Sequence, residues 1–379
     1  MLREHRAVFI SALVLAVLLG PNPLLAAPTA EPGASLLFPY FEVELDEPDG
    51  LTTMLSVSNT SPQSSRQVLA HAVIWSDWGI PVYSWDFYLA PGDMISYNLR
   101  DLLTYGSLPA TSPPAGFGAH CTAPLAPAVT PEALADLQRK LTGRPDPVGG
   151  LCSSEPREDG AIATGSITVD YVTDCAHDGI DDPFDAGYFN GTSPIAGKSA
   201  ALVGDFFLVD PGADLAEGFS AYPLHLLNVD YSFWDGRENS DLRREPLSTN
   251  WRLRFLQGGP FEARTSFFVY HRRTVRTVPG ACVTVPVEAP ECKWSFDVFS
   301  PSGALALTDV QLEDQGRRTT GRVELDLPDD LLSGTVNFRS YYFVDAPNMG
   351  YEVDCQSLIF GAIEARGRFG TGIFGTPLH

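Results

Sequence analysis

Alternation of apolar and polar residues with a period of two is the feature of this sequence that most constrains its fold. The runs Thr52–Val57, Val68–Trp75, Val82–Leu89 and Met94–Leu99 are rich in β-branched and aromatic residues, and turn formers separate them. The same pattern resumes from Trp251 to Ala365. Short strands at this spacing are typical of antiparallel sandwiches. We therefore expect an all-β protein with two tandem immunoglobulin-like antiparallel β-sandwiches.

Four segments of the first half match four segments of the second half in the same order. The pairs are Thr52–Val57 with Thr265–Tyr270, Ile74–Ser76 with Val298–Ser300, Asp101–Leu103 with Asp330–Leu332, and Gly165–Val169 with Gly334–Phe338. Chance similarity among strands would not preserve this order, so the pattern favours an internal duplication. One long irregular β domain is the alternative.

The two halves differ in how they connect matched segments. Asp330 and Gly334 are 4 positions apart, whereas their counterparts Asp101 and Gly165 are 64 positions apart. The first half therefore carries a long insertion, at 104–164, and a shorter one follows at 176–200.

A helix is predicted inside the first insertion. Thr130 is a good N-cap, Pro131 suits the first helical position, leucines follow at helical spacing, and Gly143 is placed to end the helix. Because Cys121 and Cys152 flank this helix, the sequence predicts a disulfide-flanked helical insertion.

The N-terminus has the pattern of a secretory signal peptide. Arg3 and Arg6 precede an apolar run from Ala7 to Leu19, and Ala26 and Ala27 supply a cleavage site. The run is too short for a helix that spans ~30 Å of hydrocarbon, so we expect a secreted or periplasmic protein with no membrane span. The predicted organisation is a signal peptide at 1–26, a first sandwich at 27–232, a linker at 233–249, a second sandwich at 250–366 and a tail at 367–379.

An even number of cysteines in an exported chain favours disulfides. None of the cysteine spacings is a zinc-binding pattern. Sequence proximity suggests the pairs Cys121–Cys152 and Cys282–Cys292, which leaves Cys175–Cys355.

The formal net charge of −22 opposes binding to the phosphate backbone, so we exclude nucleic-acid binding. The sequence lacks the zincin, nucleophile-elbow and phosphate-loop motifs, and no catalytic residue is assigned. Only three of the 25 basic residues are lysines, which suggests a GC-rich bacterial genome.

The second insertion contains the best candidate for a cation site. Clustered aspartates and flexible glycines can offer the oxygen ligands that Ca²⁺ prefers, although Asp and Gly also favour hydrated turns. The candidate calcium ligands are Asp178, Asp181, Asp182 and Asp185. Of the histidines, His71 lies in a predicted strand, and we expect it to have a structural role. His177 lies in the acidic loop and is the histidine that best suits a functional site.

Aromatic residues offer a second kind of site. Trp75, Trp78 and Trp85 lie close together in the sequence, and exposed rings stack on sugars. Trp78 precedes Gly79 in a turn and is the ring we expect to be exposed and ligand-binding. Core packing explains most of the others.

The stretch that begins with Leu36–Val43 and continues through Asn98–Asp101 resembles the opening of a group of uncharacterised exported bacterial proteins. The resemblance continues weakly through Gly165–Cys175 and Gly204–Phe207. It implies secretion and a β-rich fold, and it transfers no activity, ligand or site residue.

These observations favour an exported, non-enzymatic protein with a binding or envelope-associated structural role and an extracellular or envelope partner. A carbohydrate-active protein, either a glycan-binding module or a glycoside hydrolase, is the alternative. We expect any ligand to contact the insertions, including Asp181, Asp182 or Asp185, because loops commonly display binding groups. An insertion that merely shields a strand edge is the other explanation.

Overall fold

The all-β prediction is confirmed. The computed structural model describes residues 31–61, 67–126, 128–157, 160–177, 179–189, 195–227, 243–244, 246–272, 278–282, 292–311, 318–344, 351–365, 369–374 and 376–377. In these ranges the chain is mainly antiparallel strand, and its α-helices are α2 (Leu99–Tyr105) and α3 (Pro131–Leu141). The predicted signal peptide and linker residues 233–242 and 245 lie outside the described residues.

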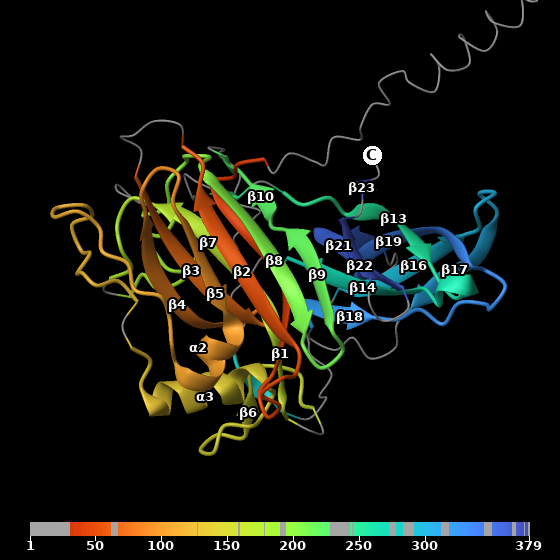
Figure 1. The fold of residues 1–379 in the computed structure, drawn as a ribbon, viewed down its shortest axis with the longest axis horizontal. Coiled ribbons are helices and arrows are strands. Elements are labelled where there is room, and N and C mark those ends of the chain that lie inside the picture. The colour runs from red at the N-terminus through yellow and green to blue at the C-terminus, as the bar shows by residue number, and fades with distance from the viewer. Residues whose placement is uncertain are drawn as a thin grey trace, which may run out of the picture. The chain divides into compact units, whose positions relative to one another are not determined.

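Residues 35–227, the first repeat, form two main sheets. The five-stranded sheet has the order β10-β1-β7-β3-β4 and the four-stranded sheet has the order β5-β2-β8-β9 (Figure 1). The bounds are β1 (Ser35–Glu44), β2 (Thr52–Asn59), β3 (Val68–Ser76), β4 (Pro81–Leu89), β5 (Met94–Asn98), β7 (Ile162–Val172), β8 (Leu202–Asp210), β9 (Leu215–Ser220) and β10 (Tyr222–Leu224).

Residues 250–377, the second repeat, have the same strand order. One sheet runs β23-β13-β19-β16-β17, with β20 also paired to β19, and the other runs β18-β14-β21-β22. The bounds are β13 (Asn250–Leu256), β14 (Arg264–His271), β16 (Lys293–Phe299), β17 (Leu305–Gln311), β18 (Thr320–Val323), β19 (Ser333–Val344), β20 (Tyr351–Asp354), β21 (Ser357–Ala365), β22 (Phe369–Phe374) and β23 (Thr376–Pro377). The predicted tail at 367–379 therefore supplies the last two strands, β22 and β23, which pair with β21 and β13.

Equivalent glycines show how closely the repeats match. A Cβ on Gly165 in β7 would lie 2.0 Å from the Trp75 carbonyl oxygen and 2.8 Å from the Phe41 ring. A Cβ on Gly334 in β19 would lie 2.1 Å from the Phe299 carbonyl oxygen and would meet a second phenylalanine ring in the same way. The repeats thus share local packing as well as strand order.

Three of the four predicted segment pairs fall in equivalent strands, one of them with a correction of register; in the fourth pair, Asp101–Leu103 lies in α2 and Asp330–Leu332 lies in a turn and loop before β19. The Thr53 hydroxyl bonds to the backbone of Glu42, and the Thr265 hydroxyl bonds to the backbone of Leu256 in the same manner. Thr265 therefore corresponds to Thr53, and the predicted match to Thr52 is off by one residue. The immunoglobulin-like character of the two sandwiches stays a prediction.

Each repeat has an apolar core between its sheets. In the first repeat, the Phe38 ring of β1 meets the Phe206 ring of β8 with centroids 6.0 Å apart. In the second, Phe267 of β14 meets Phe296 of β16 at 6.3 Å. Burial of aromatic side chains dominates core energetics, so these facing rings explain why the alternating pattern produces sandwiches.

The two repeats also share a core. Phe268 and Phe360, on β14 and β21, belong to the apolar cluster of the first repeat. Phe268 lies 4.9 Å from the Tyr40 ring, and Phe360 lies 4.8 Å from the Phe219 ring. Both repeats accordingly belong to one compact unit, Pro32–His379.

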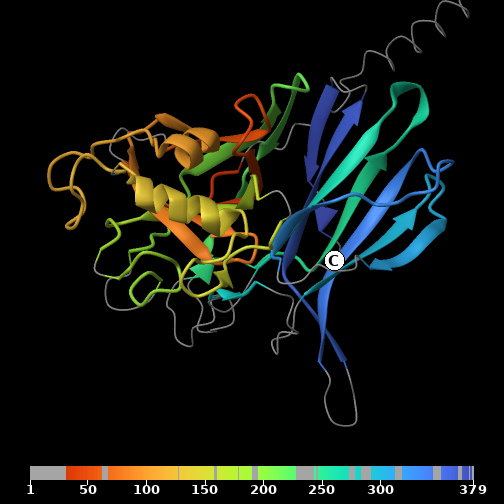
Figure 2. The same ribbon diagram turned by 90° about the horizontal axis from the view of Figure 1, so that it is seen from below.

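The predicted helix is present as α3. The Thr130 hydroxyl accepts a hydrogen bond from the backbone of Ala133, Pro131 begins the helix, and Gly143 adopts a left-handed conformation after it. Leu137 and Leu141 are buried. Figure 2 shows α3 on the side of the first repeat.

Candidate functional site

The insertions of the first repeat explain an unusual burial pattern in β3. Every residue from Val68 to Ser76 is buried, whereas in β16, the equivalent strand of the second repeat, buried residues alternate with partly or fully exposed ones. The outer face of β3 is covered by the second insertion: Phe184 packs on Trp75 with ring centroids 5.7 Å apart, and Tyr188 packs on His71 at 5.7 Å. The insertion thus closes a sheet face that is partly open to solvent in the second repeat.

A buried polar network fixes this insertion to the sheet. His71 contributes Nδ1 to a 2.8 Å contact with Asp86 and Nε2 to a 3.1 Å contact with the Asp181 carbonyl oxygen. Burial opposes a charge on His71, but the hydrogen bond and negative charge of Asp86 outweigh it and raise the pKa of His71. His71 therefore has the structural role predicted for it.

All six cysteines form disulfides, but the predicted pairing is wrong. The bonds are Cys121–Cys175, Cys152–Cys282 and Cys292–Cys355. The pairing predicted from sequence proximity is wrong because α3, which separates Cys121 from Cys152, packs against the core of the first repeat. The two cysteines therefore lie next to different partners. The first of these bonds joins the first insertion to the residue that precedes the second insertion, and the second bond joins the two repeats.

The Cys121–Cys175 bond brings together three side chains that we call the histidine cluster: His120, Asp174 and His177. Their candidate ligand atoms all lie within 4.8 Å of one another. The imidazole rings of His120 and His177 are stacked, with centroids 3.6 Å apart and planes inclined by 7°. His120 is exposed, while the other two residues are half-buried.

Hydrogen bonds fix the members of the histidine cluster. One carboxylate oxygen of Asp174 lies 2.6 Å from Nδ1 of His120, and the other accepts the backbone N–H groups of His120 and Cys175. Partial burial opposes the charge of Asp174, but these bonds outweigh it and lower the pKa of the carboxyl group. Nδ1 of His177 lies 2.8 Å from the Cys175 carbonyl oxygen.

Carboxylates of the predicted calcium ligands accept hydrogen bonds from backbone N–H groups of their own loop. The Asp185 carboxylate accepts the backbone N–H groups of Asp181 and Asp182, and the Asp182 carboxylate accepts that of Phe184. Such bonds shape turns. In the part of the chain that the structure describes, these aspartates are not among the groups whose ligand atoms converge, and Asp178 lies outside that part. The calcium site stays a prediction that these contacts do not support.

The prediction of an exposed Trp78 is wrong. This ring is 3% exposed and packs in a small apolar cluster with Ile80 and Cys152. Its indole N–H donates to the Glu155 carboxylate at 3.2 Å. The turn that carries Trp78 is covered by the first insertion, so a turn position did not imply exposure.

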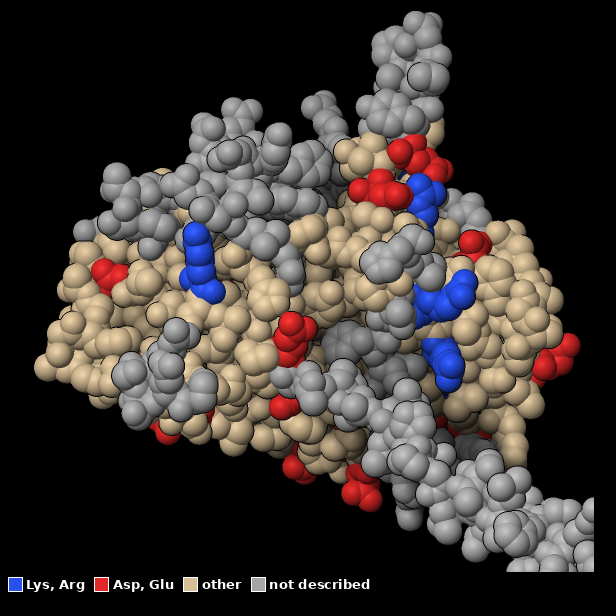
Figure 3. Space-filling view, turned by 90° about the horizontal axis from the view of Figure 1, so that it is seen from above, with Lys and Arg blue, Asp and Glu red and all other residues tan. Residues whose placement is uncertain are grey.

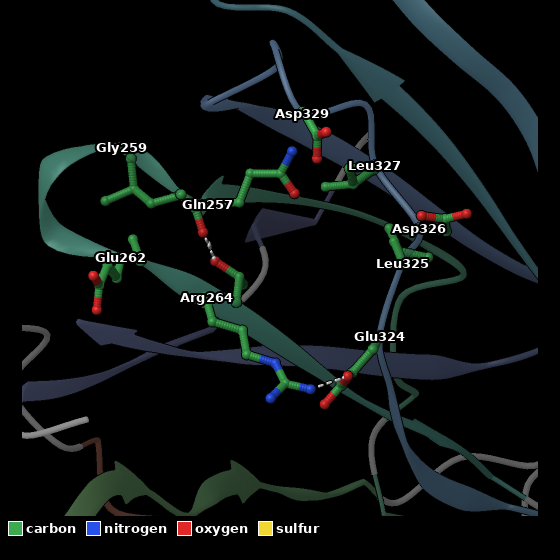
Figure 4. Close-up of a pocket in the computed structure, with 13 residues that line it drawn as sticks. Gln257, Gly259, Glu262, Arg264, Glu324, Leu325, Asp326, Leu327 and Asp329 are labelled. Atoms are coloured by element: carbon green, nitrogen blue, oxygen red, sulfur yellow. Dashed lines mark hydrogen bonds and ion pairs between the residues drawn. The ribbon is translucent and has the colours of Figure 1, made fainter. Parts of the chain in front are cut away.

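A pocket of about 530 Å³ lies in the second repeat, between the turn after β13 and the segment after β18 (Figure 4). Its polar lining includes Gln257, Glu262, Arg264, Glu324, Asp326 and Asp329. Arg264 forms an ion pair with Glu324, and the Gln257 amide donates to the Pro328 carbonyl oxygen at 2.7 Å. The remaining carboxylates give the pocket a negative charge.

Charge elsewhere is more evenly distributed. On the face shown in Figure 3, most of the described surface is uncharged and both signs of charge are present. This face accordingly offers no single acidic surface, despite the net charge of −22.

No protein-family model, curated protein or solved structure matches this chain. The resemblance to exported bacterial proteins accordingly stays a prediction. No helix in the described ranges has the length and apolar character needed to cross a membrane.

Sequence reasoning singled out His177 but missed His120 and Asp174. The sequence feature that could have identified them is their position next to cysteines: His120 directly precedes Cys121, and Asp174 directly precedes Cys175. With the correct disulfide pairing, these flanking residues would have been placed together.

Proposed function

We propose that this is an exported, non-enzymatic binding protein whose ligand surface is formed by the two insertions of the first repeat. One observation carries the proposal. The two repeats share strand order and local packing, yet the insertion at 104–164, which Cys121–Cys175 ties to the start of the second insertion, has no counterpart between Asp330 and Gly334 of the second repeat. The second repeat makes the equivalent sandwich without that insertion, so the sandwich itself does not require it.

The export part of the proposal is supported by the signal-peptide pattern at 1–26 and by the three disulfides. Disulfides persist in oxidising compartments and are rare in the cytosol. A secreted or periplasmic location accounts for both features.

Site-specific photo-crosslinking tests the proposed surface. A benzophenone amino acid would replace Tyr105 or Val148, which lie in the first insertion and are 70% and 97% exposed. Matched control positions are Leu305 and Phe343 in the second repeat, which are 53% and 54% exposed. We expect discrete adducts with envelope components from the insertion positions only. Equal adduct yields from both sets of positions would refute the assignment of the surface.

A carbohydrate-binding role is the second candidate, and the pocket of Figure 4 is what favours it. A volume of about 530 Å³ with amide, guanidinium and carboxylate groups suits a small polar ligand such as a sugar. A glycan array probed with the oxidised protein tests this candidate. Binding that is lost in Glu324→Gln and kept in Glu132→Gln, an exposed residue of α3, would support it; an array without signal would remove it.

A further inference from the structure

We propose that the histidine cluster binds a divalent transition-metal ion through Nε2 of His120 and Nε2 of His177. The proposal goes beyond the binding function above and holds whether or not the insertions contact a macromolecule. Three features support the proposal: the tautomers of the two histidines, the disulfide that holds them near each other, and the imidazole nitrogens that they offer as ligands.

The tautomer of His177 follows from its hydrogen bond. Its Nδ1 lies 2.8 Å from the carbonyl oxygen of Cys175. A carbonyl oxygen only accepts hydrogen bonds, so Nδ1 carries the proton and Nε2 of the neutral ring keeps its lone pair. Histidines that ligate metals commonly donate their other N–H to a backbone carbonyl in this way.

His120 has the other common partner of a metal-binding histidine. Its Nδ1 lies 2.6 Å from a carboxylate oxygen of Asp174, the other kind of partner that orients metal-binding histidines. That carboxylate is held in turn by the backbone N–H groups of His120 and Cys175, both at 2.9 Å. Asp174 is therefore a positioning residue that leaves Nε2 of His120 available.

A disulfide fixes the backbone next to both histidines, while the exposed His120 ring has room to reorient. The Cys121–Cys175 bond links the residue after His120 to the residue after Asp174, two positions before His177. The His120 side chain is 47% exposed, so it can rotate. Rotation is required, because a metal lies near the plane of each imidazole ligand and the two rings are now parallel. We therefore expect metal binding to break the ring stack.

The ligand atoms select the class of metal. Two imidazole nitrogens suit Zn²⁺, Cu²⁺ and Ni²⁺, whereas Ca²⁺ and Mg²⁺ prefer oxygen. Thiolate ligands are not available because every cysteine is in a disulfide. Water or a ligand group would complete the coordination of a site with two protein nitrogens.

Calorimetric titration of the oxidised, full-length mature protein with Zn²⁺ tests the proposal. We expect saturable binding of one ion per chain that Ca²⁺ in excess does not displace. His120→Gln and His177→Ala should each abolish it, while His225→Ala, a half-buried histidine outside the cluster, should leave it unchanged. Circular dichroism and peptide mapping of Cys121–Cys175 would verify that the variants are folded.

Two further readouts separate ligation from a structural effect. Asp174→Asn should weaken Zn²⁺ binding about 10–100-fold, the usual cost of losing an orienting partner, and should change the ¹⁵N shifts that report the His120 tautomer. Zn²⁺ should also perturb the imidazole resonances of both cluster histidines and spare His225. Absence of saturable binding, displacement by Ca²⁺, or equal binding by His120→Gln and the unmodified protein would overturn the proposal.

Discussion

Replacing Gly165 with alanine should destabilise the first repeat through a defined clash. The new Cβ would lie 2.0 Å from the Trp75 carbonyl oxygen and 2.8 Å from Cε1 of Phe41. Neither neighbour is a flexible side-chain end: one is backbone in the β3–β7 ladder, and the other is a ring that is 1% exposed. The strands must separate locally or the ring must leave its position.

The expected cost follows from this geometry. Overpacking that forces backbone shifts costs about 1–3 kcal/mol, and the backbone contact here places Gly165 near the upper end. Alanine regains about 0.5–1 kcal/mol, because glycine loses more chain entropy on folding. The net loss is about 2 kcal/mol, which would lower the melting temperature of a unit of 150–250 residues by about 4–8 °C and lowers that of the larger unit Pro32–His379 by less.

Thermal melts of three variants test the reasoning. Gly334→Ala should cost a similar amount, because its Cβ would lie 2.1 Å from the Phe299 carbonyl oxygen. Gly149→Ala is the control, since its nearest neighbour is a Leu151 side-chain carbon at 3.6 Å, an ordinary contact. If Gly165→Ala melts with the control, the packing argument is wrong. A large loss for Gly165→Ala without one for Gly334→Ala would contradict the equivalence of the repeats.

Two further predictions concern the seam between the repeats. Burial, with a smaller contribution from Glu364, raises the pKa of Glu217 to about 7, so its contribution to stability is complete below the unfolded pKa and is lost as the pH rises through 7. Glu217→Gln should therefore stabilise the protein at about pH 8 and flatten the pH dependence of its melting temperature between about pH 5 and pH 8, with Glu132→Gln as the control. Replacing Cys152 and Cys282 by serine should cost about 4 kcal/mol, since the bond closes a long loop; a chemical denaturation midpoint equal to that of the unmodified protein would contradict this.

The strands and the repeat could be predicted because both depend on local pattern. The alternation in β13, with Trp251, Leu253 and Phe255 inward, needs no knowledge of distant residues. The same rule failed for β3, where His71 and Trp75 are on the outer face but are buried. What covers that face is an insertion far along the chain, and alternation carries no information about such a cover.

The candidate site could be predicted only in part, because its residues meet through tertiary contacts. His177 drew attention by its place in an acidic loop, but the aspartates around it form turns, and its actual neighbour is His120. The exposure of Trp78 was predicted wrongly for the same reason as that of β3, because an insertion distant in sequence covers it. In each case the local sequence was interpreted correctly as a turn or loop, and the segment packed against it was missing from the argument.

The Cys121–Cys175 disulfide determines where the cluster histidines lie, and this gives a further prediction. A disulfide requires Cα atoms within about 7 Å, so the Cys121–Cys175 bond by itself places the two cluster histidines near each other. Replacing both Cys121 and Cys175 by serine should therefore weaken Zn²⁺ binding, because the ligands lose their frame. The serine variant of the Cys152–Cys282 bond is the matched control: it also lacks one disulfide, but that disulfide joins the repeats and lies outside the histidine cluster. Calorimetric titration of both variants decides the matter, since equal weakening would assign the effect to global stability and unchanged binding in both would show that the histidines need no disulfide to meet.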